Sequence, residues 1–252
     1  EGSCPVVFSK GVISMSQKPM IAIPVMARTL PELEEKLTAV APLDFDILEW
    51  RMDGLSSLSP ALVKRGLALV KSHCQRPVIV TIRTSEEGGH FPYDHAAYEA
   101  CVKAAMGILT PERDAIDVEM ERTSSASLIS CAHTLGLTVI VSFHDFAHTP
   151  KKEDIVSRFL AMKDRKASIG KIAVMAHSDA DAHTMMDAMA QVHKTAPDFP
   201  FIGISMGPFG QVTRTEGGKA GSILTFASAG EASAPGQIAL ADMRRILDKA
   251  YR

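Results

Sequence analysis

The sequence predicts an α/β protein folded as a (β/α)8 barrel, also known as a TIM barrel. Strand-like and helix-like segments alternate eight times along the chain, which is the element order of this fold. Five of the strand-like segments are apolar on one face and carry ionisable side chains on the other, as expected for strands between outer helices and a polar centre. The length suits a single domain over residues 1–252, since such barrels commonly take about 250 residues.

The elements follow one another in strand–helix order. We expect strands at 21–26, 46–51, 77–83, 115–121, 138–144, 171–175, 201–206 and 222–226, where apolar and β-branched residues are concentrated. We expect helices at 33–40, 61–73, 94–109, 125–135, 151–163, 178–193, 217–221 and 239–250. The seventh helix, at 217–221, has the weakest pattern of the set.

Capping residues support several of these boundaries. Thr29 and Glu32 have the spacing of a capping box ahead of the first helix. Ser59-Pro60 predicts the start of the second helix, because serine caps helices and proline suits the first helical position. Gly136 is expected to end the fourth helix. Thr149-Pro150, a capping residue followed by proline like Ser59-Pro60, is expected to start the fifth.

Residues 1–19 form an N-terminal extension ahead of the barrel. Apolar residues at 6–8 and 12–15 flank Ser9-Lys10-Gly11, a pattern typical of a β-hairpin. We expect this hairpin to close the bottom of the barrel.

Composition excludes several classes of function. The net charge is −2, which gives no electrostatic footprint for nucleic acid or an anionic membrane. No apolar run approaches the roughly 18–20 residues that span a bilayer, and no secretory signal pattern is present. The 4 cysteines are far apart and form no CxxC pair, which favours reduced thiols and a cytoplasmic location.

Lys171 is the most informative residue for chemistry. It opens an apolar segment, where it shares a strand face with Ala173 and Met175. Burial disfavours the ammonium form of a lysine, and an uncharged amine is a nucleophile that condenses with carbonyl groups. The alternative is a lysine at a strand edge whose stem packs while its amine reaches water.

Other strands end in ionisable side chains on the same face. Glu49 and Arg51 end the second strand, Arg83 ends the third and His144 ends the fifth. Active sites of such barrels lie at the C-terminal ends of the strands, so these groups should meet there. Lys171 reaches the same place if its strand begins earlier, near Ser168, or if its side chain runs along the barrel axis.

Six stretches of sequence resemble the type I 3-dehydroquinate dehydratases, the Schiff-base enzymes of the shikimate pathway. The stretches are Phe45–Arg51, Arg83 with Glu86–Gly89, Ser142–Phe146, Gly170–Met175, Arg214 and Ala232–Gln237. They occur in the family's order and cover the barrel from Ile21 to the C-terminus. The resemblance implies a (β/α)8 fold, the substrate 3-dehydroquinate, no metal or other cofactor, and a homodimer. The sequence departs from the family pattern at 207–221.

The residues suit dehydration of a β-hydroxy ketone to 3-dehydroshikimate, the third step of the shikimate pathway in aromatic amino acid biosynthesis. Lys171 would form the imine, because a protonated C=N accepts electrons better than C=O. His144 would take the proton beside the carbonyl and later protonate the departing hydroxyl. Glu87, similar in position to the family's histidine partner, would orient that ring. We therefore expect a carbon–oxygen lyase.

The remaining candidates would bind the substrate. Arg214 would hold its carboxylate in a bidentate pair. Glu49, Arg51 and Arg83 would hold hydroxyl groups or screen one another. Ser233 and Gln237, on a Pro-Gly segment, would form a lid that excludes water.

Each assignment has a structural alternative. His144 could be an ordinary hydrogen-bonded histidine, and Glu49 with Arg51 a structural ion pair. Ser233 and Gln237 could be ordinary loop residues. A metal site at His144 and His148 is disfavoured. The HxxxH spacing places both rings on one metal only in a helix, and no helix is predicted for this segment.

Two other functions remain open at this point. The glycines at 217–221 follow the seventh strand, where barrels often bind phosphate, so a class I aldolase of a phosphorylated sugar could use the same imine. A catalytically silent barrel that binds a metabolite or a partner protein is the other. Arg214 favours a carboxylate over a phosphate, and the full set of inward ionisable residues disfavours a silent barrel.

Overall fold

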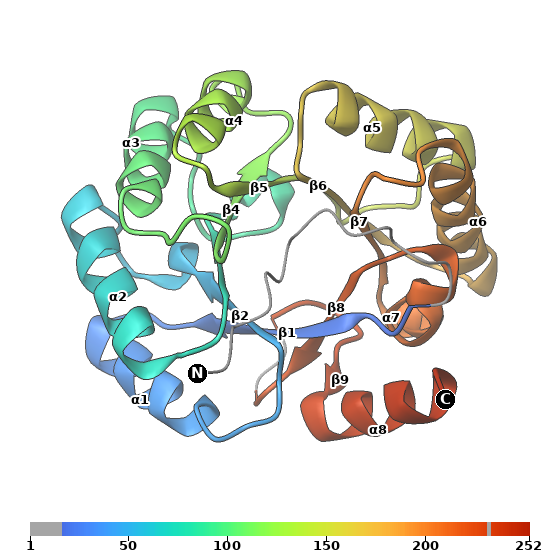
Figure 1. Ribbon diagram of the computed structural model, residues 1–252, viewed down its shortest axis with the longest axis horizontal. Coiled ribbons are helices and arrows are strands. Elements are labelled where there is room, and N and C mark those ends of the chain that lie inside the picture. The colour runs from blue at the N-terminus through green and yellow to red at the C-terminus, as the bar shows by residue number, and fades with distance from the viewer. Residues whose placement is uncertain (1–16, 231–232) are drawn as a thin grey trace.

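The computed structural model describes residues 17–230 and 233–252, in which a curled parallel sheet lies inside a ring of helices (Figure 1). The strands in these residues are β1 Met20–Met26, β2 Ile47–Arg51, β3 Val78–Thr81, β4 Ala115–Glu119, β5 Thr138–Asp145, β6 Ile169–Met175, β7 Phe201–Met206, β8 Leu224–Ser228 and β9 Ile238–Ala239. Their order is β7-β6-β5-β4-β3-β2-β1-β8-β9, and every pairing is parallel.

The α-helices lie outside the sheet, each between two strands or after the last one (Figure 1). They are α1 Leu30–Val40, α2 Pro60–His73, α3 His95–Met106, α4 Ser125–Thr134, α5 Lys152–Asp164, α6 Asp179–Thr195, α7 Gln211–Glu216 and α8 Leu240–Ala250. Short 3-10 turns η1 Met52–Gly54, η2 Ser85–Glu87, η3 Pro208–Gly210 and η4 Gly217–Ala220 lie in the connections.

The sheet closes on itself between β7 and β8. A parallel bridge joins Phe201 to Ser222, and the Ile223 N–H donates to the Phe201 carbonyl at 3.0 Å. The contact is short, but it brings the two outer strands of the main sheet together. The predicted (β/α)8 barrel is therefore confirmed.

The interior of the barrel is apolar at the end where the strands begin. Ile47, Ile79, Ile140, Ile169 and Ile202 meet there in one cluster, each from a different strand. Residues two positions further along these strands are on the same inner face and are largely polar. A separate, larger cluster that includes Trp50 and Phe159 fills the space between the sheet and the helices. The alternation of apolar and ionisable faces expected from the sequence is confirmed.

Two predicted caps are confirmed and one is wrong. The hydroxyl of Thr29 accepts the Glu32 N–H at 3.3 Å, and that of Ser59 accepts the Leu62 N–H at 3.3 Å. Helix α5 instead begins at Lys152, and Thr149 Oγ1 donates to the Met175 carbonyl at 2.7 Å. That threonine joins the segment after β5 to the end of β6, so it does not cap the helix.

The seventh helix lies earlier than predicted. Helix α7 occupies Gln211–Glu216, and the expected range 217–221 holds the 3-10 turn η4 and Gly221. The predicted location was wrong because three glycines in five residues favour a tight turn over a helix. The hairpin predicted at 6–15 lies outside the described residues.

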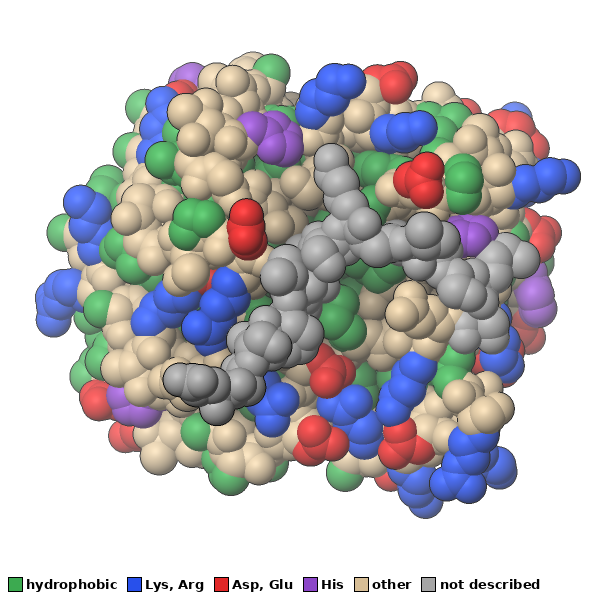
Figure 2. Space-filling model, viewed as in Figure 1, with side chains coloured by type: hydrophobic (Ala, Val, Ile, Leu, Met, Phe, Trp, Pro, Cys, Tyr) green, Lys and Arg blue, Asp and Glu red, His purple; other side chains and the backbone are tan. Residues whose placement is uncertain are grey.

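On the face seen in Figure 2, basic and acidic side chains are interspersed, in keeping with the net charge of −2. Within residues 17–230 and 233–252, no helix combines the length and the apolar character needed to cross a membrane.

Close packing of α2 on the sheet gives a stability prediction. A Cβ at Gly66 would lie 2.5 Å from the Trp50 ring, so Gly66→Ala should destabilise the protein by about 1–3 kcal/mol through overpacking. Gly107→Ala is the control, because a Cβ there meets nothing closer than 3.8 Å and φ is −69°. Urea unfolding of both variants measures the difference, and an unchanged or stabilised Gly66→Ala would contradict the packing argument.

Candidate active site

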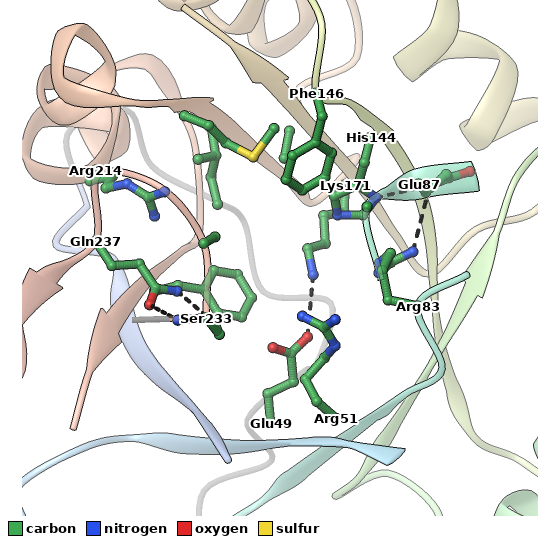
Figure 3. A pocket seen from close by; sticks show the side chains of 16 residues that line it. Glu49, Arg51, Arg83, Glu87, His144, Phe146, Lys171, Arg214, Ser233 and Gln237 are labelled. Atoms are coloured by element: carbon green, nitrogen blue, oxygen red, sulfur yellow. Dashed lines mark hydrogen bonds and ion pairs between the residues drawn. The ribbon is translucent and has the colours of Figure 1, made fainter. Parts of the chain in front are cut away.

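One pocket at the C-terminal ends of the strands gathers every side chain predicted for the site (Figure 3). Its volume is about 520 Å³ including the open space at its mouth. The predicted residues that line it are Glu49, Arg51, Arg83, Glu87, His144, Lys171, Arg214, Ser233 and Gln237. They come from β2, β5, β6, α7 and the segments after β3 and β8, so residues from all around the barrel meet there.

Lys171 reaches the pocket because β6 begins at Ile169, two residues before it. This is the earlier strand start that the sequence allowed as one of two ways for Lys171 to reach the site. Its side chain points into the barrel, and the residue is 5% exposed. The amine Nζ lies 3.4 Å from Glu49 Oε1, 3.5 Å from Asp117 Oδ2 and 4.6 Å from the centre of the Phe226 ring. The amine therefore faces the pocket with a carboxylate from β2, a carboxylate from β4 and an aromatic face beside it.

His144 is paired with Glu87. Its Nδ1 lies 2.9 Å from Glu87 Oε2, which leaves Nε2 as the ring nitrogen not committed to this pair (Figure 3). Burial, and nearby cations led by Arg83, lower the pKa of His144 well below its ordinary value. Burial raises the pKa of Glu87 to about 8, with Arg83 opposing the shift and Glu119 adding to it. Near neutral pH the empty site therefore holds a protonated Glu87 that donates to a neutral imidazole.

Arg83 is the centre of a buried charge network. Its Nη1 donates to Glu119 Oε1 at 2.9 Å and to Ser142 Oγ at 3.0 Å, and its Nη2 donates to Asp117 Oδ1 at 2.9 Å. Burial by itself lowers the pKa of Arg83, but Asp117 and Glu119 outweigh burial and raise it above its ordinary range. Both terminal nitrogens of the guanidinium thus already donate hydrogen bonds to protein side chains.

Arg51 is held by Asp53, two residues further on. The guanidinium donates through Nε and Nη2 to the two carboxylate oxygens at 2.8 and 2.7 Å. Asp53 also accepts the N–H groups of Arg83 at 3.1 Å and His90 at 3.2 Å. Burial raises the pKa of Asp53, but the Arg51 pair outweighs it and lowers that pKa below its ordinary value. The structural alternative for Arg51 was an ion pair with Glu49; in the structure Arg51 forms a bidentate pair with Asp53 instead.

Arg214 has no carboxylate partner among residues 17–230 and 233–252. It is 1% exposed, and within the described part of the chain its one hydrogen bond is from Nη2 to the Pro235 carbonyl at 3.1 Å. Its Nε has no partner in the same residues. Burial lowers the pKa of Arg214 to about 10, so the side chain is still a cation at neutral pH. An anionic group entering the pocket would find this charge available.

Ser233 and Gln237 close a short loop over the pocket. The Ser233 N–H donates to Gln237 Oε1 at 2.9 Å, and Gln237 Nε2 donates to Ser233 Oγ at 3.0 Å (Figure 3). Gly236 has a φ of +77°, and a Cβ there would lie 2.3 Å from the Gly207 carbonyl oxygen. The loop therefore depends on glycine to lie against the segment after β7. Ala232, part of the same sequence stretch, lies outside the described residues.

Sequence reasoning missed three residues of the site. Asp117 was visible on the inner face of its strand but was not assigned to the site, and Phe226 lay in a strand with no ionisable residue. Asp53 had no signal, because it lies in a 3-10 turn where neither strand nor helix periodicity applies. The pairing of β5 with β6 places Ser142 beside Lys171, a register that could not be read from spacing alone.

The two histidines of the alternative metal site point to different surroundings. His148 is exposed and its Nδ1 lies 3.2 Å from Asp145 Oδ1, whereas His144 points into the pocket. Across the described part of the chain, no three His, Cys, Asp or Glu side chains are grouped to hold a metal ion.

The glycine-rich stretch at 217–221, the hint of a phosphate site in the alternative aldolase function, does not lie at the pocket. It leads into the start of β8, at the opposite end of the strands from the pocket. A Cβ at Gly218 would lie 2.3 Å from the Gln17 carbonyl oxygen and 2.8 Å from Tyr251 Oη. The glycines allow this close packing at the bottom of the barrel.

Comparison with known proteins identifies consistent relatives. A model of the family "Type I 3-dehydroquinase" matches residues 21–252. The 3-dehydroquinate dehydratase of Syntrophotalea carbinolica is 39% identical over 247 residues, which is 96% of this chain and 94% of that protein. The Bacillus subtilis 3-dehydroquinate dehydratase is 36% identical, covering 96% of each. The crystal structure of a type I 3-dehydroquinate dehydratase from Clostridium difficile, with covalently modified comenic acid, matches with a TM-score of 0.86 and 32% identity over 93% of this chain and 92% of that one.

The His144–Glu87 pair gives a pH prediction. Below about pH 8 Glu87 should donate its proton to Nδ1, so that Nε2 carries the ring hydrogen; above it, Nδ1–H should donate to the Glu87 carboxylate. The ring stays neutral and changes tautomer. Nitrogen-15 NMR of labelled histidine measures this directly, and a single tautomer from pH 6 to 10 would contradict it. Glu87→Gln is the control, since its amide cannot titrate.

Proposed function

The chain belongs to the type I 3-dehydroquinase family, and we propose that it dehydrates 3-dehydroquinate to 3-dehydroshikimate through an imine on Lys171. The relatives are 3-dehydroquinate dehydratases, so the enzyme is assigned as a carbon–oxygen lyase. The observation that carries the mechanism is the placement of the Lys171 amine, the His144–Glu87 pair and the Arg214 cation around one pocket.

Lys171 would act as the nucleophile. Its amine adds to the ketone carbon of the substrate, and loss of water leaves a protonated C=N bond. This cation withdraws electrons from the neighbouring C–H bond more strongly than the ketone did. Glu49 and Asp117, about 3.4–3.5 Å from Nζ, are placed to stabilise the positive nitrogen. The covalent modification named for the Clostridium difficile relative is in keeping with a nucleophile in the pocket.

His144 would carry the proton. When Glu87 is ionised and accepts the Nδ1–H, Nε2 is the unprotonated ring nitrogen and takes a proton from the carbon beside the imine, and the electrons form an enamine. The enamine expels hydroxide from the next carbon as the same nitrogen returns its proton, so water leaves and a conjugated imine remains. Hydrolysis of that imine then frees Lys171 and the product.

Arg214 would bind the substrate carboxylate. A buried guanidinium without a carboxylate partner among the described residues is costly until an anion arrives, and a carboxylate fits its planar donors. Glu49, Arg51 and Arg83 would contact the hydroxyl side of the substrate. The loop with Ser233 and Gln237 would close over it and exclude water.

An aldolase acting on a phosphorylated sugar has lost its main support. Its argument rested on the glycines at 217–221, which pack at the far end of the barrel. Phosphate would have to bind elsewhere, and no feature of the pocket favours it over a carboxylate.

The wider assignments are part of the proposal. We place the reaction as the third step of the shikimate pathway, towards chorismate and the aromatic amino acids. A homodimer, a cytoplasmic location and a reaction without cofactor stay predictions.

The first functional prediction separates Lys171 from His144. Borohydride reduction with 3-dehydroquinate should trap an adduct on Lys171 in wild-type protein and in His144→Ala, but none in Lys171→Ala. The reason is that the histidine variant keeps the nucleophile and loses the elimination step. Peptide mass mapping identifies the modified residue. Normal turnover by either variant, or an adduct on another lysine, would refute the mechanism.

The second concerns Arg214. Arg214→Gln should raise KM for 3-dehydroquinate by about 10²-fold or more, because a charge-assisted pair contributes about 3 kcal/mol. Arg245→Gln is the control, an exposed arginine on α8 that pairs with Asp242. Steady-state kinetics measures both. A KM for Arg214→Gln close to wild type would show that the carboxylate binds elsewhere.

A further inference from the structure

We propose that Arg122 is a positioning residue that stabilises the charged form of the Glu87 carboxylate from outside the pocket, and thereby sets the pH at which His144 Nε2 is free to take a proton from substrate. The inference rests on the proposed function, in which the His144–Glu87 pair is the acid–base group. Arg122 does not line the pocket, so it acts only through other residues.

Arg122 reaches the pair from the turn between β4 and α4. Its Nη2 lies 3.8 Å from Glu87 Oε1 and its Nε lies 3.2 Å from Glu119 Oε2. The guanidinium also lies over the Tyr93 ring, 4.9 Å from its centre, and the side chain is 11% exposed. Glu86 Oε2, from a more exposed side chain, lies 3.9 Å from Arg122 Nη1. The aromatic ring and three carboxylates thus hold a largely buried cation in one place.

The two oxygens of Glu87 have different surroundings. Oε2 pairs with His144 at 2.9 Å and lies 3.6 Å from Arg83 Nη1. Oε1 is buried and has no hydrogen-bond partner among the described residues. Arg122 is the cation on that side, at ion-pair distance but beyond hydrogen-bond reach. A negative charge on Oε1 therefore depends on Arg122 more than on any direct bond.

The other charges around Glu87 do not replace Arg122. The ionisable groups that face Glu87 are Arg83, Arg122, Glu86, Asp117, Glu119 and His144. Arg83 is already committed to Asp117 and Glu119. Without Arg122, Glu87 would face these acids with one shared cation, so it would hold its proton more tightly.

Arg122 also holds the segment that carries Glu87. It pairs with Glu119, whose Oε1 accepts the Thr84 N–H at 2.8 Å and whose Oε2 accepts the Thr84 hydroxyl at 2.7 Å. Thr84 begins the turn η2 that ends at Glu87. One arginine thus acts on the charge of Glu87 and on the position of its backbone.

The test measures the pH at which His144 changes tautomer, by nitrogen-15 NMR of the resting enzyme. In Arg122→Gln this midpoint should rise by about one pH unit, since an opposite charge within about 4–6 Å shifts a carboxyl by one to three units. The rising limb of kcat against pH should move the same way, with KM unchanged. Arg122→Lys keeps the charge and should give a smaller shift. If Arg122→Gln does not fold, Arg122→Met, which keeps the stem over Tyr93, takes its place.

Two controls isolate the effect. Arg158→Gln removes a charge that pairs with Glu121, next to Arg122, without touching Glu87, so its midpoint should stay at the wild-type value. In a Glu87→Gln background, which should show no tautomer change with pH, adding Arg122→Gln should introduce none. A lower kcat at every pH with an unmoved midpoint, or an equal shift in Arg158→Gln, would overturn the proposal. Normal turnover by His144→Ala would instead refute the proposed function, whatever the midpoint in Arg122→Gln.

Discussion

The buried guanidinium of Arg83 is the interaction on which the rest of the site depends. It joins Asp117 and Glu119 of β4 to Ser142 of β5 by hydrogen bonds of 2.9–3.0 Å. Isolated charges at this depth would be prohibitive, and even paired ones seldom add net stability. Their role here is to fix geometry. The network holds two neighbouring strands, and through Glu119 and Thr84 it also holds the turn that carries Glu87.

The same network sets the electrostatics of the pocket. Burial raises the pKa of Glu87, and Glu119 and Asp117, the acids that pair with Arg83, raise it further. Asp117 also lies close to Lys171. Cations that neutralise these acids lower the pKa of His144. The His144–Glu87 pair can therefore share one proton near neutral pH while the imidazole stays uncharged. Arg214 donates to the Pro235 carbonyl and not to this network. It leaves a positive charge at the other side of the pocket (Figure 3).

An apolar layer beneath the pocket makes these charges possible. Isoleucines from five strands fill the barrel where the strands begin, and each buried side chain of this kind stabilises the fold by about 1.5–3 kcal/mol. The layer lies beneath the pocket, which is lined by residues at the C-terminal ends of the strands and in the segments that follow them. Stability and function are thus placed at opposite ends of the same strands, as barrels of this class generally arrange them.

The sequence by itself determined the barrel and the side chains that face its centre, because alternation along a strand is local and fixes which face each residue takes. It could not determine the partners. Arg51 pairs with Asp53 rather than Glu49 because a 3-10 turn brings Asp53 back beneath it, and no periodicity marks such a turn. The glycines at 217–221 could not be placed from spacing, since their role is to let Gln17 and Tyr251, distant in sequence, approach closely. Arg122 reaches Glu87 because the parallel pairing of β3 with β4 sets the ends of these strands side by side, and such contacts between distant residues are decided by tertiary structure alone.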